Sequence, residues 1–416
     1  MTRLRALLIP LVLLGLLLGG AETLTGRAQT VDAGQIAIAA QDGNIYLYDI
    51  ATDETTPLTD DAVSGSKAYS WPTWSNDGRL AFFGSSRAPD DQYQFGIFIR
   101  NVAGAIERIY TSSDEFFTYA SWAPADCPAG NCRDLAVLYT AASGNLALRR
   151  VRVDGEVMIE ELSEGGPHYW DWSPDGSSML WARFGTELSI YDADSNAISE
   201  TFTDRLGFQR AVDWSPTDNR MLAAVRAPGR LNDLMIFEDG ERLVLAEGFP
   251  GPVSFEWSPD GTKVAYLDEQ RARLTVADAR TGEAIATAPD DAYAFFWAPD
   301  STRLAYLTIT QIQDSGDVLA SYQGQRTVPR LQWVVFSPES GNSARLAAFL
   351  PTRETIYYLR FFDQFARSHR LWSPDSRYLT YGEVLADGRS VVSLLDTTAP
   401  STVRTLMEGQ IGVFSW

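Results

Sequence analysis

The side chains of this chain that could carry chemistry are few, and three carboxylates share one position in a repeated phrase. Asp171, Asp213 and Glu256 each stand immediately before a tryptophan. Carboxylates brought together could hold a hard cation such as Ca²⁺ with backbone carbonyls and water, and so support metal-assisted hydrolysis or elimination. The alternative is that each carboxylate forms hydrogen bonds or ion pairs within its own repeat, with Arg210 as a nearby partner.

Both histidines lie a few residues before tryptophans of the same phrase. With the charged residues near them, they could orient a polar or anionic ligand group. The alternative is that they are isolated polar side chains, satisfied by neighbouring strand ends. The candidate ligand-binding residues are His168, Asp171, Arg210, Asp213, Glu256, Asp363, His369 and Arg370.

Composition excludes several classes of function. The 416 residues include only two histidines and two cysteines, which leaves little room for a three-histidine zinc site or an iron–sulfur cluster. The formal charge of −20 would repel phosphate backbones and anionic lipid surfaces, so we expect no nucleic-acid partner. No Gly-x-Ser-x-Gly nucleophile elbow occurs. We therefore expect no catalytic residue and no cofactor, with Ca²⁺ as the open alternative.

The first 28 residues are typical of a secretory signal peptide. Arg3 and Arg5 precede an apolar run of about 16 residues, shorter than the roughly 17–25 of a membrane span, and small residues follow. We expect cleavage after Ala28, with Ala21 as a second site and an uncleaved anchor as the alternative. Export to the periplasm or beyond the cell, without an integral membrane span, follows from this prediction.

An exported chain gives its two cysteines a structural role. Cys127 and Cys132 flank a short loop rich in turn-forming residues, and an oxidising compartment would let them form a local disulfide. A metal site is the weaker interpretation, because two thiolates without a neighbouring histidine supply half of a tetrahedral shell.

One phrase recurs through the rest of the chain: tryptophan, a small residue, often Pro-Asp-Gly, then an aliphatic strand. The intervals are roughly 40–50 residues with one near 75, and the shorter ones suit a four-stranded propeller blade. The Ser-Pro-Asp-Gly part predicts a type I turn followed by a left-handed residue, so its aspartate is assigned to the turn. The tryptophans are assigned to packing between blades: Trp74, Trp122, Trp172, Trp214, Trp257, Trp297, Trp372 and Trp416.

The two ends of the chain are out of phase with this repeat. Residues 36–39 and 45–49 read as second and third strands without a tryptophan strand before them, whereas residues 411–416 are a tryptophan strand with nothing after it. Residues 33–416 are therefore predicted to form one all-β propeller, closed by the C-terminal strand in the N-terminal blade. Eight blades are expected, with seven as the alternative.

The long interval is interpreted as one blade with excursions around residues 310–330 and 351–365, and with residues 331–336 as its third strand. A ninth, degenerate blade remains the other interpretation. The aromatic stretch 361–367 lies outside the repeat, and three roles are open to it: capping the channel, meeting a partner or packing on a blade.

The Trp-Ser-Pro-Asp-Gly turns followed by Leu-Ala-Tyr-like strands resemble the WD-type repeats of TolB-like propellers, over roughly residues 33–416. That resemblance implies a periplasmic scaffold that binds a peptidoglycan-associated lipoprotein. TolB carries an α/β domain ahead of a six-bladed propeller. In this sequence the predicted strands begin within a few residues of the signal-like segment, and more than six blades are expected. Only the architecture and a general binding role therefore carry over.

The repeats also resemble the propeller halves of prolyl oligopeptidase and dipeptidyl peptidase enzymes. Their hydrolase domain, of about 200 further residues with a nucleophile elbow, has no counterpart here. We therefore expect an exported, monomeric, non-catalytic scaffold that binds a protein or a cell-envelope ligand. The alternative is a propeller enzyme, a metal-assisted hydrolase or lyase that uses carboxylates at the central channel.

Overall fold

The computed structural model describes residues 33–87, 92–124, 134–153, 156–166, 168–207, 211–313, 327–399 and 402–415. The proposed signal segment, Arg210, the two cysteines and Trp416 lie outside these ranges, so the statements made about them stay predictions.

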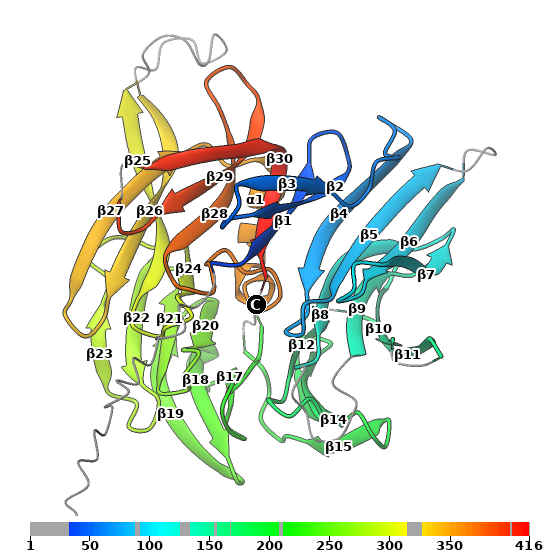
Figure 1. Ribbon diagram of the computed structural model, residues 1–416. Helices are drawn as coiled ribbons and strands as arrows, with labels where there is room; N and C mark the ends of the chain where they lie inside the picture. Colours follow the sequence, from blue (N-terminus) through cyan, green and yellow to red (C-terminus); the bar gives the residue numbers. More distant parts are fainter. Residues whose placement is uncertain are drawn as a thin grey trace, which may run out of the picture. The chain divides into compact units, whose positions relative to one another are not determined.

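Antiparallel sheets follow one another along the described chain and form a ring (Figure 1), which confirms the predicted all-β propeller. Six sheets take four consecutive strands each. In chain order they are β4 (Lys67–Trp74), β5 (Leu80–Arg87), β6 (Tyr93–Arg100), β7 (Ile106–Ser112); β8 (Phe116–Trp122), β9 (Asp134–Thr140), β10 (Leu146–Arg152), β11 (Met158–Glu164); β12 (His168–Trp172), β13 (Ser178–Arg183), β14 (Glu187–Asp192), β15 (Ala197–Thr201); β16 (Asp213–Trp214), β17 (Met221–Arg226), β18 (Asn232–Glu238), β19 (Glu241–Phe249); β20 (Val253–Trp257), β21 (Lys263–Asp268), β22 (Arg273–Asp278), β23 (Ala284–Thr287); and β24 (Ala294–Trp297), β25 (Leu304–Gln313), β26 (Thr327–Ser337), β27 (Asn342–Phe349). A short 3₁₀ turn, Pro228–Arg230, precedes β18.

The seventh sheet has six strands and closes the ring. Its order is β28 (Tyr378–Val384), β29 (Ser390–Asp396), β30 (Val403–Phe414), β1 (Gln35–Ala40), β2 (Ile45–Asp49), β3 (Glu54–Pro57). The first half of β30 pairs with β29 and the second half with β1, where Ile36 lies opposite Phe414. Closure by the C-terminal strand is therefore confirmed.

The number of sheets is seven in the described chain, which matches the alternative and not the eight that were expected. The reason is that one continuous strand, β30, belongs to the last two repeats and fuses them into a single sheet. In addition, the segment around Trp372 is too short to form a strand of its own and makes single bridges, Trp372 to Leu379 and Arg370 to Phe414.

The repeated turn has the conformation that its sequence predicts. In the turn after Trp257, the Gly261 N–H donates to the Ser258 carbonyl at 2.8 Å, and Gly261 has a φ of +68°. The Asp260 carboxylate accepts hydrogen bonds from the Ser258 hydroxyl at 2.6 Å and from the Thr262 N–H at 3.0 Å. The aspartate thus serves its own turn.

The long interval contains both a confirmed strand and two unexpected helices. β26, the third strand of its sheet, includes the predicted residues 331–336. Residues 310–313 and 327–330, which were assigned to an excursion, instead extend the β25–β26 hairpin. The second excursion forms α1 (Arg353–Arg360) and α2 (Phe362–Phe365). The side chain of Thr352 caps α1 by accepting from the Thr355 N–H at 3.2 Å.

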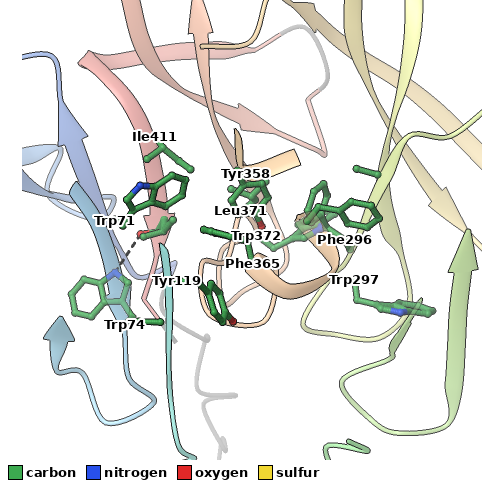
Figure 2. Close-up of a cluster of buried hydrophobic side chains, with 14 of the residues drawn as sticks. Trp71, Trp74, Tyr119, Phe296, Trp297, Tyr358, Phe365, Leu371, Trp372 and Ile411 are labelled. Atoms are coloured by element: carbon green, nitrogen blue, oxygen red, sulfur yellow. Dashed lines mark hydrogen bonds between the residues drawn. The ribbon is translucent and has the colours of Figure 1, made fainter. Parts of the chain in front are cut away.

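These helices fill the centre of the ring with aromatic side chains (Figure 2). The ring centroid of Phe365 lies 5.0 Å from that of Trp71 and 4.9 Å from that of Tyr119. Tyr358 reaches the other side, with its centroid 5.9 Å from that of Phe296. Of the three roles open to stretch 361–367, the structure therefore supports a packing role, inside the ring and against several sheets.

Tryptophans of the repeat bind neighbouring sheets through their indole nitrogens. In three cases the acceptor is the carbonyl of the residue just before the preceding tryptophan of the repeat: Trp122 to Thr73 at 2.9 Å, Trp297 to Glu256 at 3.3 Å and Trp372 to Phe296 at 3.1 Å. The indole nitrogens of Trp172, Trp214 and Trp257 are buried and have no hydrogen-bond partner within the described part of the chain. This difference separates one arc of three sheets from the rest of the ring.

The difference gives a matched pair of substitutions. Trp372→Phe should cost about 1–3 kcal/mol more stability than Trp257→Phe, because only the first leaves a buried carbonyl without its donor and only the second removes an unpaired N–H. Each indole ring also has an arginine guanidinium over it: Arg303 lies 5.7 Å from the Trp372 ring centroid, and Arg220 lies 4.7 Å from that of Trp257. Both variants therefore lose a cation–π contact of the same kind, and the difference between them reports on the hydrogen bond. Denaturant unfolding of the two variants measures the difference, and equal costs would contradict the assignment of the hydrogen bonds.

Candidate functional site

A cavity of about 460 Å³ lies where the innermost strands of six sheets end, on the side of the repeated proline turns. Its wall contains tryptophans from these sheets and the segment that follows α2. Its charged residues are Asp171, Asp213, Glu256, Arg367 and Arg370. Cavities of this size hold small organic ligands.

The three carboxylates come from the arc of sheets with unpaired indoles, and they connect neighbouring sheets. Asp171, the second-to-last residue of β12, accepts a hydrogen bond from the backbone N–H of Trp214 at 2.8 Å. Asp213, on β16, accepts one from the backbone N–H of Trp257 at 2.9 Å. At Asp171 and Asp213 the position before tryptophan thus links one sheet to the next, which differs from bonding within one repeat.

Arg367 lies between two of these carboxylates. Its guanidinium nitrogens are 3.6 Å from Asp171 Oδ2 and 3.6 Å from Asp213 Oδ1. Nη1 also donates to the backbone carbonyl of Val212, whereas the buried Nε and Nη2 have no hydrogen-bond partner among the residues that the structure describes. The guanidinium therefore compensates both aspartates through charge and leaves hydrogen-bonding capacity at the cavity wall.

Glu256 differs from the two aspartates. It is half-buried on β20, and its carboxylate has neither a hydrogen bond nor an ion pair with any residue in the described ranges. Burial raises its pKa to about 7, against the smaller opposing effects of Arg367 and Arg370. Glu256 therefore changes its charge near neutral pH.

Burial also shifts the other charged groups of the cavity. It raises the pKa of Asp171, and it raises that of Asp213 well above the usual range, in both cases against the attraction of Arg367. Burial lowers the pKa of Arg370 to about 9. Both arginines are charged at neutral pH, so the cavity wall carries three carboxyl groups and two cations.

The arrangement gives no support to the Ca²⁺ site that the sequence left open. Within the described ranges, no group of three or more His, Cys, Asp or Glu side chains is arranged to hold a metal ion. Asp171 and Asp213 instead accept backbone hydrogen bonds and face Arg367.

The remaining candidate residues are placed in different surroundings. His168 is buried at the start of β12, and burial lowers its pKa to about 4. Asp363, on α2, accepts a hydrogen bond from the Ala211 N–H at 2.9 Å. The structure thus brings Asp171, Asp213, Glu256 and Arg370 to one cavity, whereas His168 is not among the residues that line it.

His369 forms a polar cluster in the core. Its Nδ1 lies 2.7 Å from the hydroxyl of Ser368, which lines the cavity, and its Nε2 lies 3.1 Å from the Thr73 hydroxyl. The serine–histidine contact is of the kind found in hydrolases. However, complete burial lowers the pKa of His369 to about 3, which makes it a weak base. We assign this cluster to the packing of the central segment.

Arg367 was missed as a site residue. It was noticed only within the aromatic stretch, although two arginines three positions apart in a segment outside the repeat, Arg367 and Arg370, are a usable signal. Two positively charged residues just before a tryptophan of the repeat are well placed to meet the carboxylates of other sheets.

The fold and the site define a β-propeller with a charged central cavity. No protein-family model matches the chain, and no curated protein matches it. Solved structures similar to it include an oligogalacturonate lyase in complex with manganese (12% identity, 80% of this chain and 86% of that chain, TM-score 0.49). The C-terminal WD40 domain of Sif2 is also similar (13% identity, 80% and 84%, TM-score 0.48).

Dipeptidyl peptidase 4 of Porphyromonas gingivalis is a third similar structure (13% identity, TM-score 0.47); the match covers 73% of this chain and 49% of that one. At these identities and scores the comparisons assign no function. In the described ranges, no helix is both long and apolar enough to cross a membrane.

Proposed function

We propose that the chain is a non-catalytic binding propeller and that the central cavity is its ligand site. The observation that carries this proposal is the convergence of Asp171, Asp213, Glu256, Arg367 and Arg370 on one cavity of about 460 Å³. Charged side chains are costly to bury, and a binding site is a common reason for such a group in a fold whose stability comes from apolar packing.

The proposal places the protein outside the cytoplasm, as a TolB-like, monomeric scaffold. The support is the signal-like pattern of residues 1–28 and the WD-type phrase of the repeats. In this proposal the ligand is a small molecule or an exposed group of a protein or cell-envelope polymer. Only a group small enough to enter the cavity would contact its charged residues.

The test is a variant that fills the cavity. Ala366 lines it in a right-handed helical conformation that any side chain adopts, so Ala366→Trp should fill the space without straining the backbone. Native mass spectrometry of the protein after incubation with a metabolite extract of the cells that make it should show a one-to-one complex, at least tenfold weaker in Ala366→Trp.

Ala197→Trp is the matched control, since Ala197 is exposed on the outer strand β15. It should bind as the natural protein does. The absence of any complex, or equal binding by Ala366→Trp, would contradict the proposal.

One observation favours a second candidate, an enzyme that uses the cavity carboxyl groups. Burial raises the pKa values of Asp171, Asp213 and Glu256, and Glu256, with a pKa of about 7, is suited to general acid catalysis near neutral pH. The two candidates differ in the fate of the bound molecule. A scaffold releases it unchanged, whereas an enzyme converts it, and the mass of the released ligand decides between them.

A further inference from the structure

We infer that the central cavity selects an organic cation, one whose ammonium or guanidinium group pairs with Glu256 against a wall of tryptophans. The inference rests on the proposed function and names the ligand class of the same cavity.

The first step is the distribution of charge within the cavity. Arg367 lies 3.6 Å from both Asp171 and Asp213, so one cation already serves these two carboxylates. Each aspartate also accepts a backbone N–H, at 2.8 and 2.9 Å. Asp171 Oδ2 and both carboxylate oxygens of Asp213 are therefore engaged in contacts between neighbouring sheets and with Arg367.

The second step is the state of Glu256. It stands at the same repeat position, one sheet further on, but no described residue donates a hydrogen bond to its carboxylate, and no cationic nitrogen in the described chain lies within 4.0 Å of it. A half-buried carboxylate without a partner has the most to gain from a ligand that brings a charged donor.

The third step is the charge that Glu256 adds to the site. Arg367 faces Asp171 and Asp213, so an ionised Glu256 adds a negative charge that this arginine does not pair, and a chain with a net charge of −20 adds a field that attracts cations. An anionic ligand would face Glu256 as a like charge. A neutral ligand would leave the negative charge uncompensated.

The fourth step separates organic from inorganic cations. Trp172, Trp214 and Trp257 line the cavity beside the carboxylates. Aromatic walls favour an organic cation, which sheds its water at low cost and gains attraction to the ring faces. A hard metal ion requires several oxygen ligands, and the described residues offer no such group here.

Ionisation of Glu256 makes this recognition depend on pH. The groups that act on Glu256 from the surrounding elements are Asp171 on β12, Asp213 on β16, Asp363 on α2, Tyr358 on α1, and Arg367 and Arg370 after α2. Burial raises the pKa of Glu256 to about 7, so its carboxylate forms as the pH rises through neutrality. Affinity for a cation should therefore increase between pH 6 and pH 8.

The experiment uses three probes of similar size that differ in charge: phenethylammonium, 2-phenylethanol and 3-phenylpropionate. Isothermal titration of the full chain in 150 mM salt should show that the ammonium binds one to one and at least tenfold more tightly than the other two. At pH 6 its affinity should be lower than at pH 8. These comparisons use the natural protein and do not depend on the folding of any variant.

A pair of variants locates the cationic group. Glu256→Gln keeps the shape of the side chain and should weaken phenethylammonium binding at least tenfold, with little effect on 2-phenylethanol. Glu283→Gln is the matched control, because Glu283 is exposed between β22 and β23 of the same sheet. It should leave the affinity unchanged.

Several results would overturn the inference: equal or tighter binding of the alcohol or the carboxylate, no binding of any probe, displacement of the ammonium by millimolar Ca²⁺, or unchanged binding by a folded Glu256→Gln variant. The binding proposal itself would survive if the alcohol or the carboxylate bound and Ala366→Trp blocked it. It would fail if Ala366→Trp had no effect on any ligand.

Discussion

Removal of residues 411–416 should abolish the cooperative unfolding of the protein or leave it insoluble. The deletion takes away Ile411, Val413 and Phe414, which are 3%, 0% and 1% exposed, and opens the inner edge of β1. Burial of each such side chain contributes about 1.5–3 kcal/mol, so the three together approach the 5–15 kcal/mol that stabilises a typical domain. The exposed strand edge would also promote aggregation.

A permuted chain provides the control for this deletion. Gln35 and Ser415 are hydrogen-bonded neighbours, with the Gln35 N–H donating to Ser415 Oγ at 3.0 Å. Moving residues 409–416 to a position before Gln35, joined by a two-residue turn, rebuilds the pairing with β1 as a hairpin. Thermal melts followed by circular dichroism should show recovery of the transition. A truncated chain that melts like the intact one would show that closure does not stabilise the ring.

Replacement of Arg367 by methionine should cost about 3–5 kcal/mol at pH 8, because it leaves the buried carboxylate of Asp213 and the partly buried carboxylate of Asp171 without their cation. The cost should shrink as the pH falls. Asp171 and Asp213 have raised pKa values in the folded protein, so the stability that they contribute is present at low pH and is lost as the pH rises through the folded values. Without Arg367 those values rise further.

Urea unfolding at pH 5 and pH 8 measures this effect. Arg404→Met is the matched control, since Arg404 pairs with Asp53 at 3.1 Å on the surface, with side chains 42% and 68% exposed; it should cost below about 1 kcal/mol. Adding Asp171→Asn and Asp213→Asn to Arg367→Met should restore much of the loss. Equal losses at both pH values, or a loss no larger than that of the control, would refute the charge argument.

The parts of the fold that could be predicted from sequence are those that depend on local chemistry. The Ser-Pro-Asp-Gly turn closes on itself, so its conformation at Ser258 to Gly261 follows from four residues. The phase of the repeat then predicts that Ile36 and Phe414 share a sheet, because the incomplete repeats at the two ends complete each other, and the structure pairs these two residues.

The parts that could not be predicted depend on which residues meet across the ring. Nothing local shows that β30 continues through two repeats, so the count of seven sheets was reached only as an alternative. The helices α1 and α2 are short, and all four residues of α2 are buried, which removes the periodic polar face that marks a helix.

The candidate site could be predicted only where its residues follow the repeat. Asp171, Asp213 and Glu256 could be grouped because the repeat places them in register, and the structure puts them on one cavity. Arg367 belongs to an insertion that does not follow the repeat, so its distance to the carboxylates cannot be predicted from the repeat positions. Its place between Asp171 and Asp213 depends on how the insertion folds. Arg210, the partner expected from proximity in sequence, lies outside the described residues.

The aromatic helices at the centre of the ring give the protein two unlike ends. Phe365 and Tyr358 lie in the middle of the ring and are 2% and 1% exposed, so packed aromatic side chains occupy this part of it. Helix α1 contributes no residue to the cavity wall, and its Ile356 is 57% exposed. A second molecule could therefore contact α1 while a ligand occupies the cavity.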